Sequence, residues 1–165
     1  FKQKTAYEIG VRLVGSEMCI RDRSNRKLTD LDLCQGAEVA FARDEKELAA
    51  MVDARRSGLA FSLGGMGSAD TNFYNDAYAR QGFAEVATES QRLWLAGDRK
   101  AAAQVIPGEM VLATTLLGTE SQVADRLRVW ADVGISQIRL YPAGKNLEER
   151  LDTLGRALDL VRGLE

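Results

Sequence analysis

The sequence predicts an α/β fold with parallel strands, and three segments carry this prediction. Residues 113–144 read as strand, turn, helix, glycine and second strand, which together make one complete βαβ unit. An apolar, strand-like segment at 31–42 precedes this unit, and an amphipathic helical pattern at 147–161 follows it. The strands of a βαβ unit are buried in a parallel sheet or barrel, whose functional residues lie at the carboxyl ends of the strands. We therefore expect the functional site after Leu117 and Leu140.

Residues 1–23 are set apart from the rest of the chain. They have no starting Met, no lasting amphipathic period and no signal-peptide arrangement of basic, apolar and small residues. The segments KQKTAYEI and LVGSEMCIRDR within them resemble translated sequencing adapter, and the alternative is a natural basic leader. We predict a non-native leader over 1–23, native sequence from about Ser24 that begins inside a gene, and one piece of a single domain over 24–165.

Charge and composition narrow the function classes. The chain has 22 basic and 24 acidic residues, of which five and three lie in residues 1–23, so that 17 and 21 remain and give a net charge of −4. A weakly acidic chain without a basic stripe offers no electrostatic footprint for nucleic acid. No apolar run approaches the roughly 20 residues that a membrane span requires. We expect a small-molecule substrate and neither a nucleic-acid nor a membrane partner.

Cysteine and histidine usage limits the chemistry further. The chain has no histidine, and Cys34 is its single cysteine outside residues 1–23. One thiol cannot form an internal disulfide, which favours a cytoplasmic location. A zinc site would need carboxylates alone, which zinc seldom uses. We therefore expect no metal site and no histidine-based catalysis.

The elements before residue 113 follow from caps, periodicity and glycines. The first strand lies within 31–42. Asp44 followed by Glu47 is a capping box, and apolar residues at helical spacing extend a helix from there to about Ser62. Three glycines then break the period. Further helices are predicted at 77–80, at 83–94 and, after Asp98 as the cap, up to Val105, where Pro107 and Gly108 end the pattern.

The elements from residue 113 onward are predicted in the same way. A second strand is expected at 114–117, then a helix that ends at Gly134, then a third strand at 137–141. One face of the helix is apolar through Val123, Leu127 and Trp130. The last helix is expected to pack on one side through a row of apolar residues spaced four, three, four and three: Leu147, Leu151, Leu154, Leu158 and Val161.

Three segments together resemble a known family. They are GLAFSLGGMGSADTNFYNDA at 58–77, LWLAGDRKAAAQVIPGEMV at 93–111 and LLGTESQVADRLRVWADVGISQIRLYPAG at 116–144. Their order and spacing resemble the carboxyl-terminal third to half of the luciferase-like monooxygenase superfamily. The resemblance is greatest to the branch that uses the deazaflavin coenzyme F-420. It implies the C-terminal portion, about three βα units, of a (β/α)8 TIM barrel. The three strands would then be the sixth, seventh and eighth.

The resemblance also implies a function for the intact protein. It would transfer a hydride between coenzyme F-420 and a small organic substrate; the alternative within the superfamily is a monooxygenase that uses flavin mononucleotide (FMN). In such enzymes the cofactor performs the redox chemistry, and the protein orients it and excludes water. The residues that face the cofactor ring lie mostly on earlier strands, so we assign no catalytic residue. We expect this chain alone to be inactive and to bind cofactor weakly or not at all.

A second class of function stays open beside the enzyme. A non-catalytic α/β module could pair the exposed edge of its sheet with a second copy, because unpaired strand edges invite association. For the full-length protein we expect a homo-oligomer.

Gly118 and Thr119 are candidate cofactor-binding residues after the second strand. They end a strand and open a helix, where free backbone N–H groups and the helix dipole suit a phosphate. The loops after the last two strands of a barrel often hold a phosphate. The alternative is an ordinary helix cap by Thr119, with Gln122 completing a capping box.

Arg139, Tyr141 and Gly144 are the candidate cofactor-binding residues at the third strand. Strand geometry puts Ile138 and Leu140 on one face and Arg139 and Tyr141 on the other. If the apolar face meets the outer helices, Arg139 points into the barrel and Tyr141 toward its mouth. An inward Arg binds a cofactor phosphate or carboxylate well, and an internal ion pair is the alternative.

Two further motifs receive structural interpretations. The cluster GGMG at 64–67 follows a helix rather than a strand, so it predicts close packing or a helix stop in preference to a phosphate cradle. Asn72 is expected to cap a helix, followed by two core aromatic residues, Phe73 and Tyr74. The alternative is that these residues return toward a substrate pocket.

Overall fold

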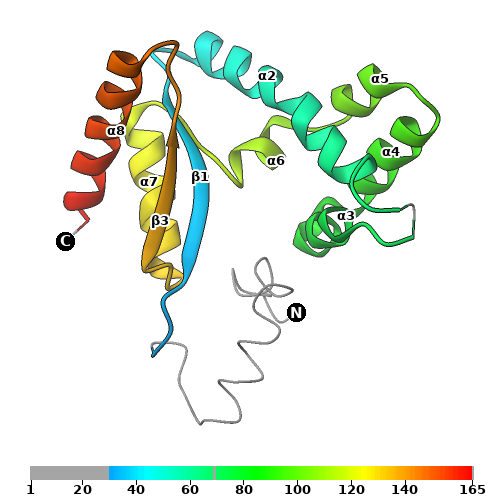
Figure 1. Ribbon diagram of the computed structural model, residues 1–165, viewed down its shortest axis with the longest axis horizontal. Helices are drawn as coiled ribbons and strands as arrows, with labels where there is room; N and C mark the ends of the chain where they lie inside the picture. The colour runs from blue at the N-terminus through cyan, green and yellow to red at the C-terminus, as the bar shows by residue number, and fades with distance from the viewer. Residues whose placement is uncertain (1–29, 69, 165) are drawn as a thin grey trace. The chain divides into compact units, whose positions relative to one another are not determined.

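The computed structural model describes residues 30–68 and 70–164, which form two compact units (Figure 1). Among the described residues, the first unit combines 30–39 with 121–164, and the second unit lies within 40–120. The leader predicted over residues 1–23 lies outside the described residues. Strand β1 (Cys34–Phe41) runs from the first unit into the second.

Two parallel strands, β1 and β3 (Gln137–Pro142), form the centre of the first unit. Their register runs from Cys34 opposite Gln137 to Val39 opposite Pro142. Beyond the last pair, the Ala143 N–H donates to the Val39 carbonyl over 2.9 Å. The strands predicted at 31–42 and 137–141 are thus confirmed, and the first is shorter than expected.

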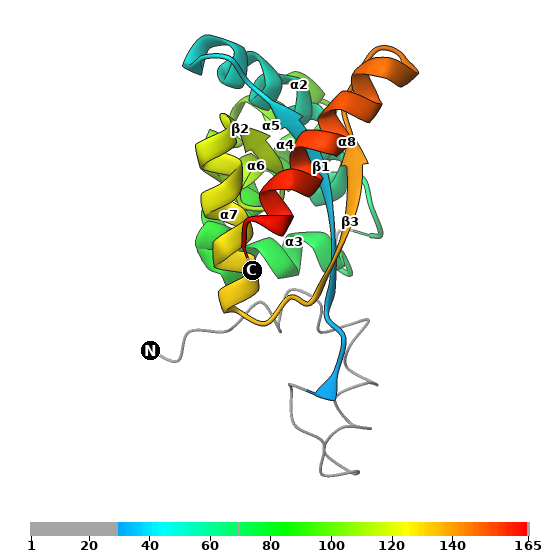
Figure 2. The ribbon, with the colours of Figure 1, turned by 90° about the vertical axis from the view of Figure 1, so that its left-hand side faces the viewer.

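Helices α7 (Glu120–Asp132) and α8 (Leu147–Arg162) lie on the same side of these two strands, as Figures 1 and 2 both show. The predicted apolar face of α7 is confirmed, because its buried residues are Val123, Leu127 and Trp130. Gly134 follows α7 with a φ of 91°, the left-handed conformation that ends a helix most easily at glycine.

The predicted packing side of α8 is wrong in part. Leu147, Leu151 and Leu158 are exposed, by 72%, 58% and 40%, whereas the buried residue of this helix is Ala157. Helix α8 contacts β3. The leucine row therefore faces largely away from the strands.

The three strands form one sheet in the order β2-β1-β3, in which β2 (Leu116–Gly118) is a short strand of the second unit. Within that unit, the Ala42 N–H donates to the Gly118 carbonyl over 2.8 Å. Three consecutive strands of a barrel would have the order β1-β2-β3, so the order expected for the sixth, seventh and eighth strands is not observed. Strand β2 has 3 residues, whereas β1 pairs with β3 at six positions. Pairing of β3 with β1 therefore satisfies more backbone N–H and carbonyl groups than pairing with β2 would.

The second unit is mainly helical. It contains α2 (Glu45–Gly64), α3 (Phe73–Tyr78), η3 (Ala79–Phe83), α4 (Ala84–Leu95), α5 (Arg99–Gln104) and α6 (Gly108–Leu112). A kink at Gly82, which has a φ of 100°, interrupts η3 just before α4 begins. The largest fully buried side chains of this unit include Leu63, Ile106, Met110 and Leu116.

The capping box predicted at the start of α2 is confirmed with one change. The Asp44 carboxylate accepts from the Glu47 N–H over 2.8 Å. The Glu47 carboxylate accepts from the Arg43 N–H over 2.8 Å and from the Arg43 guanidinium over 3.0 Å. The Glu47 side chain therefore bonds to the residue before the cap, Arg43, and not to the cap residue Asp44. These hydrogen bonds with Arg43 lower the pKa of Glu47.

Asn72 joins the end of α2 to the start of α3. Its side-chain oxygen accepts from the N–H groups of Tyr74 and Asn75, as an N-cap does, and its amide donates to the carbonyls of Ser62 and Leu63. The predicted cap is confirmed, and the side chain is buried.

The aromatic residues that follow Asn72 are not in the core. Phe73 and Tyr74 are 53% and 48% exposed, so the expectation of core aromatics is wrong. Both occupy the first turn of α3, a helix of 6 residues whose buried residue is Tyr78. This short helix buries its cap, Asn72, and its last residue, Tyr78, and leaves both aromatic side chains of its first turn at the surface.

Helix α6 and the glycine cluster complete this unit. Pro107 is the N-cap of α6, so it begins a helix where the sequence predicted an end. The Thr115 hydroxyl donates to the Val111 carbonyl over 2.9 Å at the end of α6, so β2 begins later than predicted. Gly64 confirms the close-packing interpretation of GGMG, because a Cβ there would lie 2.4 Å from the Cβ of Trp94.

Candidate functional site

The face of β1 and β3 opposite α7 and α8 is polar. The register places Gly36 of β1 beside Arg139 of β3, and Glu38 beside Tyr141. Burial alternates along β3, with Arg139 and Tyr141 exposed and Leu140 half-buried between them. The predicted division of this strand into an apolar and a polar face is therefore confirmed. Because the strands are parallel, their carboxyl ends lie at one edge of the sheet.

Arg139 and Tyr141 interact with each other on this polar face. The hydrogen bond with the Tyr141 side chain, and then the charge interactions with Tyr141 and Cys34, raise the pKa of Arg139 above its usual value. The Tyr141 ring lies over Gly36, where a Cβ would stand 3.4 Å from the ring carbon Cε2. Within residues 30–68 and 70–164, Arg139 forms no ion pair with a carboxylate, so the described part of the chain does not show the internal ion pair.

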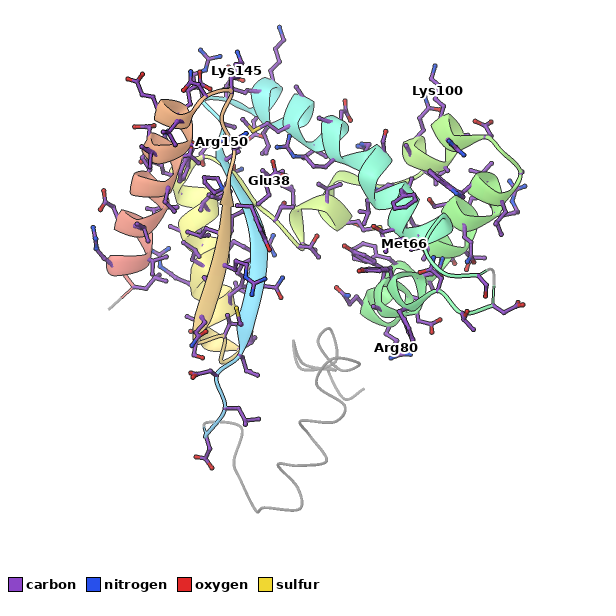
Figure 3. The ribbon with its side chains drawn as sticks, in the orientation of Figure 1. Glu38, Met66, Arg80, Lys100, Lys145 and Arg150 are labelled. Atoms are coloured by element: carbon purple, nitrogen blue, oxygen red, sulfur yellow. The ribbon has the colours of Figure 1, made fainter. Side chains whose placement is uncertain are left out.

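An open hollow of about 640 Å³ lies at the carboxyl ends of β1 and β3. It is lined by Glu38, Tyr141, Pro142, Ala143, Gly144 and Arg150. Glu38 comes from β1 and Arg150 from α8, and both are labelled in Figure 3. Two predicted site residues, Tyr141 and Gly144, thus line one hollow, and the third, Arg139, contacts Tyr141 beside it.

Gly144 packs tightly against the first turn of α8. A Cβ at this position would lie 2.7 Å from the backbone nitrogen of Arg150 and 2.8 Å from its Cγ. The Gly144 carbonyl accepts from Arg150 Nε over 3.0 Å. Glycine is therefore required here by close packing, and the same contact holds the Arg150 side chain at the rim of the hollow.

The first turn of α8 carries negative charge. Asn146 caps the helix by accepting from the Glu149 N–H over 2.9 Å, and the Glu149 carboxylate accepts from the Lys145 N–H over 2.7 Å. Glu148 and Glu149 both lie in this turn. In the lining of the hollow, Arg150 is therefore the group that would attract an anion, rather than the amides of this helix, and Glu38 adds a carboxylate to the same lining.

Gly118 and Thr119 belong to the second unit. Gly118 is buried at the end of β2, has a φ of 149°, and accepts from the Ala42 N–H. Thr119 is half-buried between β2 and α7. The predicted strand-to-helix turn is confirmed at these residues, and their binding of a phosphate stays a prediction.

The described residues contain neither a cluster of metal-binding side chains nor a helix suited to cross a membrane. In residues 30–68 and 70–164, no group of three or more histidine, cysteine, aspartate or glutamate side chains could hold a metal ion. Across the same ranges, no helix combines the length and the apolar character that crossing a membrane demands.

The comparison with protein families identifies the chain. A family model described as luciferase-like monooxygenase matches residues 19–137, which is more than half of the 165 residues. The chain belongs to this family. The match begins within the segment predicted as a leader and ends at the first residue of β3.

One relative of this luciferase-like chain is a protein of Mycobacterium tuberculosis, named as a candidate coenzyme F-420-dependent oxidoreductase. The two are 31% identical over 118 residues, which are 72% of the chain and 33% of the relative. The chain thus spans about a third of the length of that relative. The predicted resemblance to the luciferase-like family and its F-420 branch is confirmed. No solved structure matches the chain.

The sequence-based prediction missed Glu38 and Arg150 of this luciferase-like chain. A signal existed for Glu38, because the apolar neighbours Ala37 and Val39 are buried and strand alternation puts Glu38 on the polar face. The sequence contains no such signal for Arg150, because a basic residue near the start of a helix normally predicts a solvated side chain. Its place beside Gly144 depends on how the loop after β3 meets α8.

Proposed function

We propose that this chain provides part of the cofactor site of an oxidoreductase that transfers a hydride to or from a small organic substrate. The observation that carries the proposal is the hollow at the carboxyl ends of two parallel strands, whose lining includes Tyr141 and Arg150. Ligands of α/β folds bind outside the carboxyl ends of their strands. Membership of the luciferase-like family supports an oxidoreductase or monooxygenase.

The proposed cofactor is coenzyme F-420, and FMN is the alternative. The name of the M. tuberculosis relative supports F-420. Both cofactors are anionic and carry a flat ring system, and the donor set fits such a group. The guanidinium groups of Arg139 and Arg150 would bind its acidic groups, and the exposed ring of Tyr141 would contact its apolar surface. The cofactor would supply the hydride chemistry.

The remaining predicted residues have separate proposed roles, Gly118 and Thr119 in the second unit and Gly144 in the first. The backbone N–H groups at Gly118 and Thr119 would receive a phosphate at the start of α7. Gly144 would hold Arg150 in place through its carbonyl. We assign no catalytic residue on this chain.

A fluorescence titration tests the proposal. Coenzyme F-420 and FMN are titrated separately with the purified full-length protein, and the fluorescence of each cofactor is recorded. We expect saturable quenching of F-420 by that protein, and weak or no quenching by this chain alone, which spans about a third of the relative's length. Quenching of FMN alone would favour the monooxygenase branch. Quenching of neither would overturn the proposal and leave the self-associating module, which the exposed leucines of α8 favour.

A further inference from the structure

A second hollow, of about 520 Å³, lies within the second unit between α2, α4 and α5. The residues that matter in its lining are Asp53, Arg56, Trp94, Arg99 and Lys100. Three of these are cations and one is a carboxylate. The hollow is therefore a basic site on a chain whose total charge is −2.

The single carboxylate of this hollow is already paired. Arg56 Nε donates to Asp53 Oδ1 over 2.9 Å, and Arg56 Nη1 donates to the Ile106 carbonyl. The Arg56 side chain is 25% exposed, so these bonds hold a half-buried arginine in the lining of the hollow. Asp53 thus neutralises Arg56 and leaves the charges of the other two cations uncompensated.

Arg99 is held in place without an ion pair. Its guanidinium lies over the Trp94 ring, 5.1 Å from the ring centroid. Trp94 is itself fixed, because its Cβ and Cγ pack on Gly64 and its ring meets Phe61 edge to face at 5.7 Å. A stacked guanidinium keeps its N–H donors in the plane of the fork, where they remain available to a ligand.

Lys100 extends the positive charge to the rim of the hollow. Figure 3 shows it projecting from α5 into solvent. Among residues 30–68 and 70–164, neither Arg99 nor Lys100 forms an ion pair. Two adjacent uncompensated cations beside a fixed aromatic ring form a site for an oxyanion, because charge-assisted hydrogen bonds to arginine are stronger than neutral ones.

We propose that this hollow binds the oxyanion group, phosphate or carboxylate, of a small organic molecule, through the exposed Arg99 and Lys100 and the half-buried Arg56. The site is separate from the end of β1. Arg56 lies 11 residues after Glu45 at the start of α2, which corresponds to roughly 16 Å along the helix axis. The inference does not rest on the proposed function.

Isothermal titration calorimetry of the full chain tests this inference, with inorganic pyrophosphate and citrate as probes at ionic strength matched with sodium chloride. We expect saturable binding of at least one probe. Preference for pyrophosphate would assign the site to a phosphate-bearing ligand, and preference for citrate to a carboxylate. Replacement of both rim cations in R99Q/K100Q is expected to weaken binding by at least about tenfold, because two charge-assisted hydrogen bonds are lost.

Three further variants keep the test decisive. K100Q changes a fully solvated side chain, so it preserves the fold and is expected to weaken binding by about threefold or more. R128Q, which removes an exposed arginine paired with Asp125 on α7, is the matched control and is expected to bind as the wild type does. The inference is overturned if neither probe binds, if R99Q/K100Q binds as the wild type, or if R139Q abolishes binding instead.

Discussion

The close approach of Gly64 to Trp94 gives the sharpest prediction about stability. A Cβ at Gly64 would lie 2.4 Å from the Trp94 Cβ and 2.6 Å from its Cγ, both far inside van der Waals contact. Gly58 lies in the same helix, α2, and a Cβ there would meet nothing within 4 Å. The substitutions G64A and G58A therefore make the same chemical change on one helix. The new methyl group meets Trp94 at position 64 and no other atom at position 58.

The expected magnitudes have opposite signs. Replacing glycine by alanine in an unobstructed helix stabilises it by about 0.5–1 kcal/mol, so G58A should raise the free energy of unfolding by that amount. Overpacking costs about 1–3 kcal/mol, and at Gly64 it acts against the same helical gain. We expect G64A to lower the free energy of unfolding by about 1–2 kcal/mol.

Urea denaturation, followed by far-ultraviolet circular dichroism and by tryptophan fluorescence, measures both effects. The double variant G64A/W94G, compared with W94G alone, separates the clash from other causes, because glycine at position 94 removes both the Cβ and the indole that the new side chain would meet. In this background the cost of G64A should vanish. A G64A chain as stable as G58A would refute the packing of Trp94 on α2.

Two more predictions concern the second unit. Asn72→Ala should lower the free energy of unfolding by about 2–4 kcal/mol, because the buried amide caps α3 and also satisfies the carbonyls of Ser62 and Leu63. Urea denaturation measures this loss. A loss below about 0.5 kcal/mol would contradict the buried cap. Burial raises the pKa of Tyr78 in the folded chain, and its hydrogen bond with Thr114 opposes this rise. The phenol of the unfolded chain therefore ionises first, near pH 10, and the free energy of unfolding should fall as the pH rises above that value. Tyr78→Phe should flatten this fall in denaturation curves recorded across alkaline pH, and an unchanged slope would exclude Tyr78 as its source.

Local signals in the sequence predicted most helices of the fold. Asp44, Asn72 and Asp98 each cap a helix in the structure as expected. Gly134 ends α7 for the conformational reason that predicted it. These features depend on contacts within one or two helical turns, so the sequence around each cap contains the information that fixes it.

The features that the sequence did not predict depend on contacts between distant residues. The pairing of β1 with β3 joins Cys34 to Gln137, about 100 residues apart, and strand propensity does not select between possible partners. The row of leucines on α8 predicted the packing side of an amphipathic helix, but the contact surface was decided by Ala157 and β3. At the site, the polar face of β3 followed from alternation, whereas the place of Arg150 followed from the tertiary contact at Gly144.

The central claim is that the polar edge of β1 and β3 binds the cofactor. Its most direct test compares Arg139→Gln with Arg128→Gln in the coenzyme F-420 fluorescence titration. Both substitutions remove an exposed arginine of the first unit, but only Arg139 contacts Tyr141 beside the hollow. We predict that Arg128→Gln quenches F-420 as the wild type does and that Arg139→Gln needs at least about tenfold more protein for the same quenching. Equal quenching by the two variants would contradict the claim.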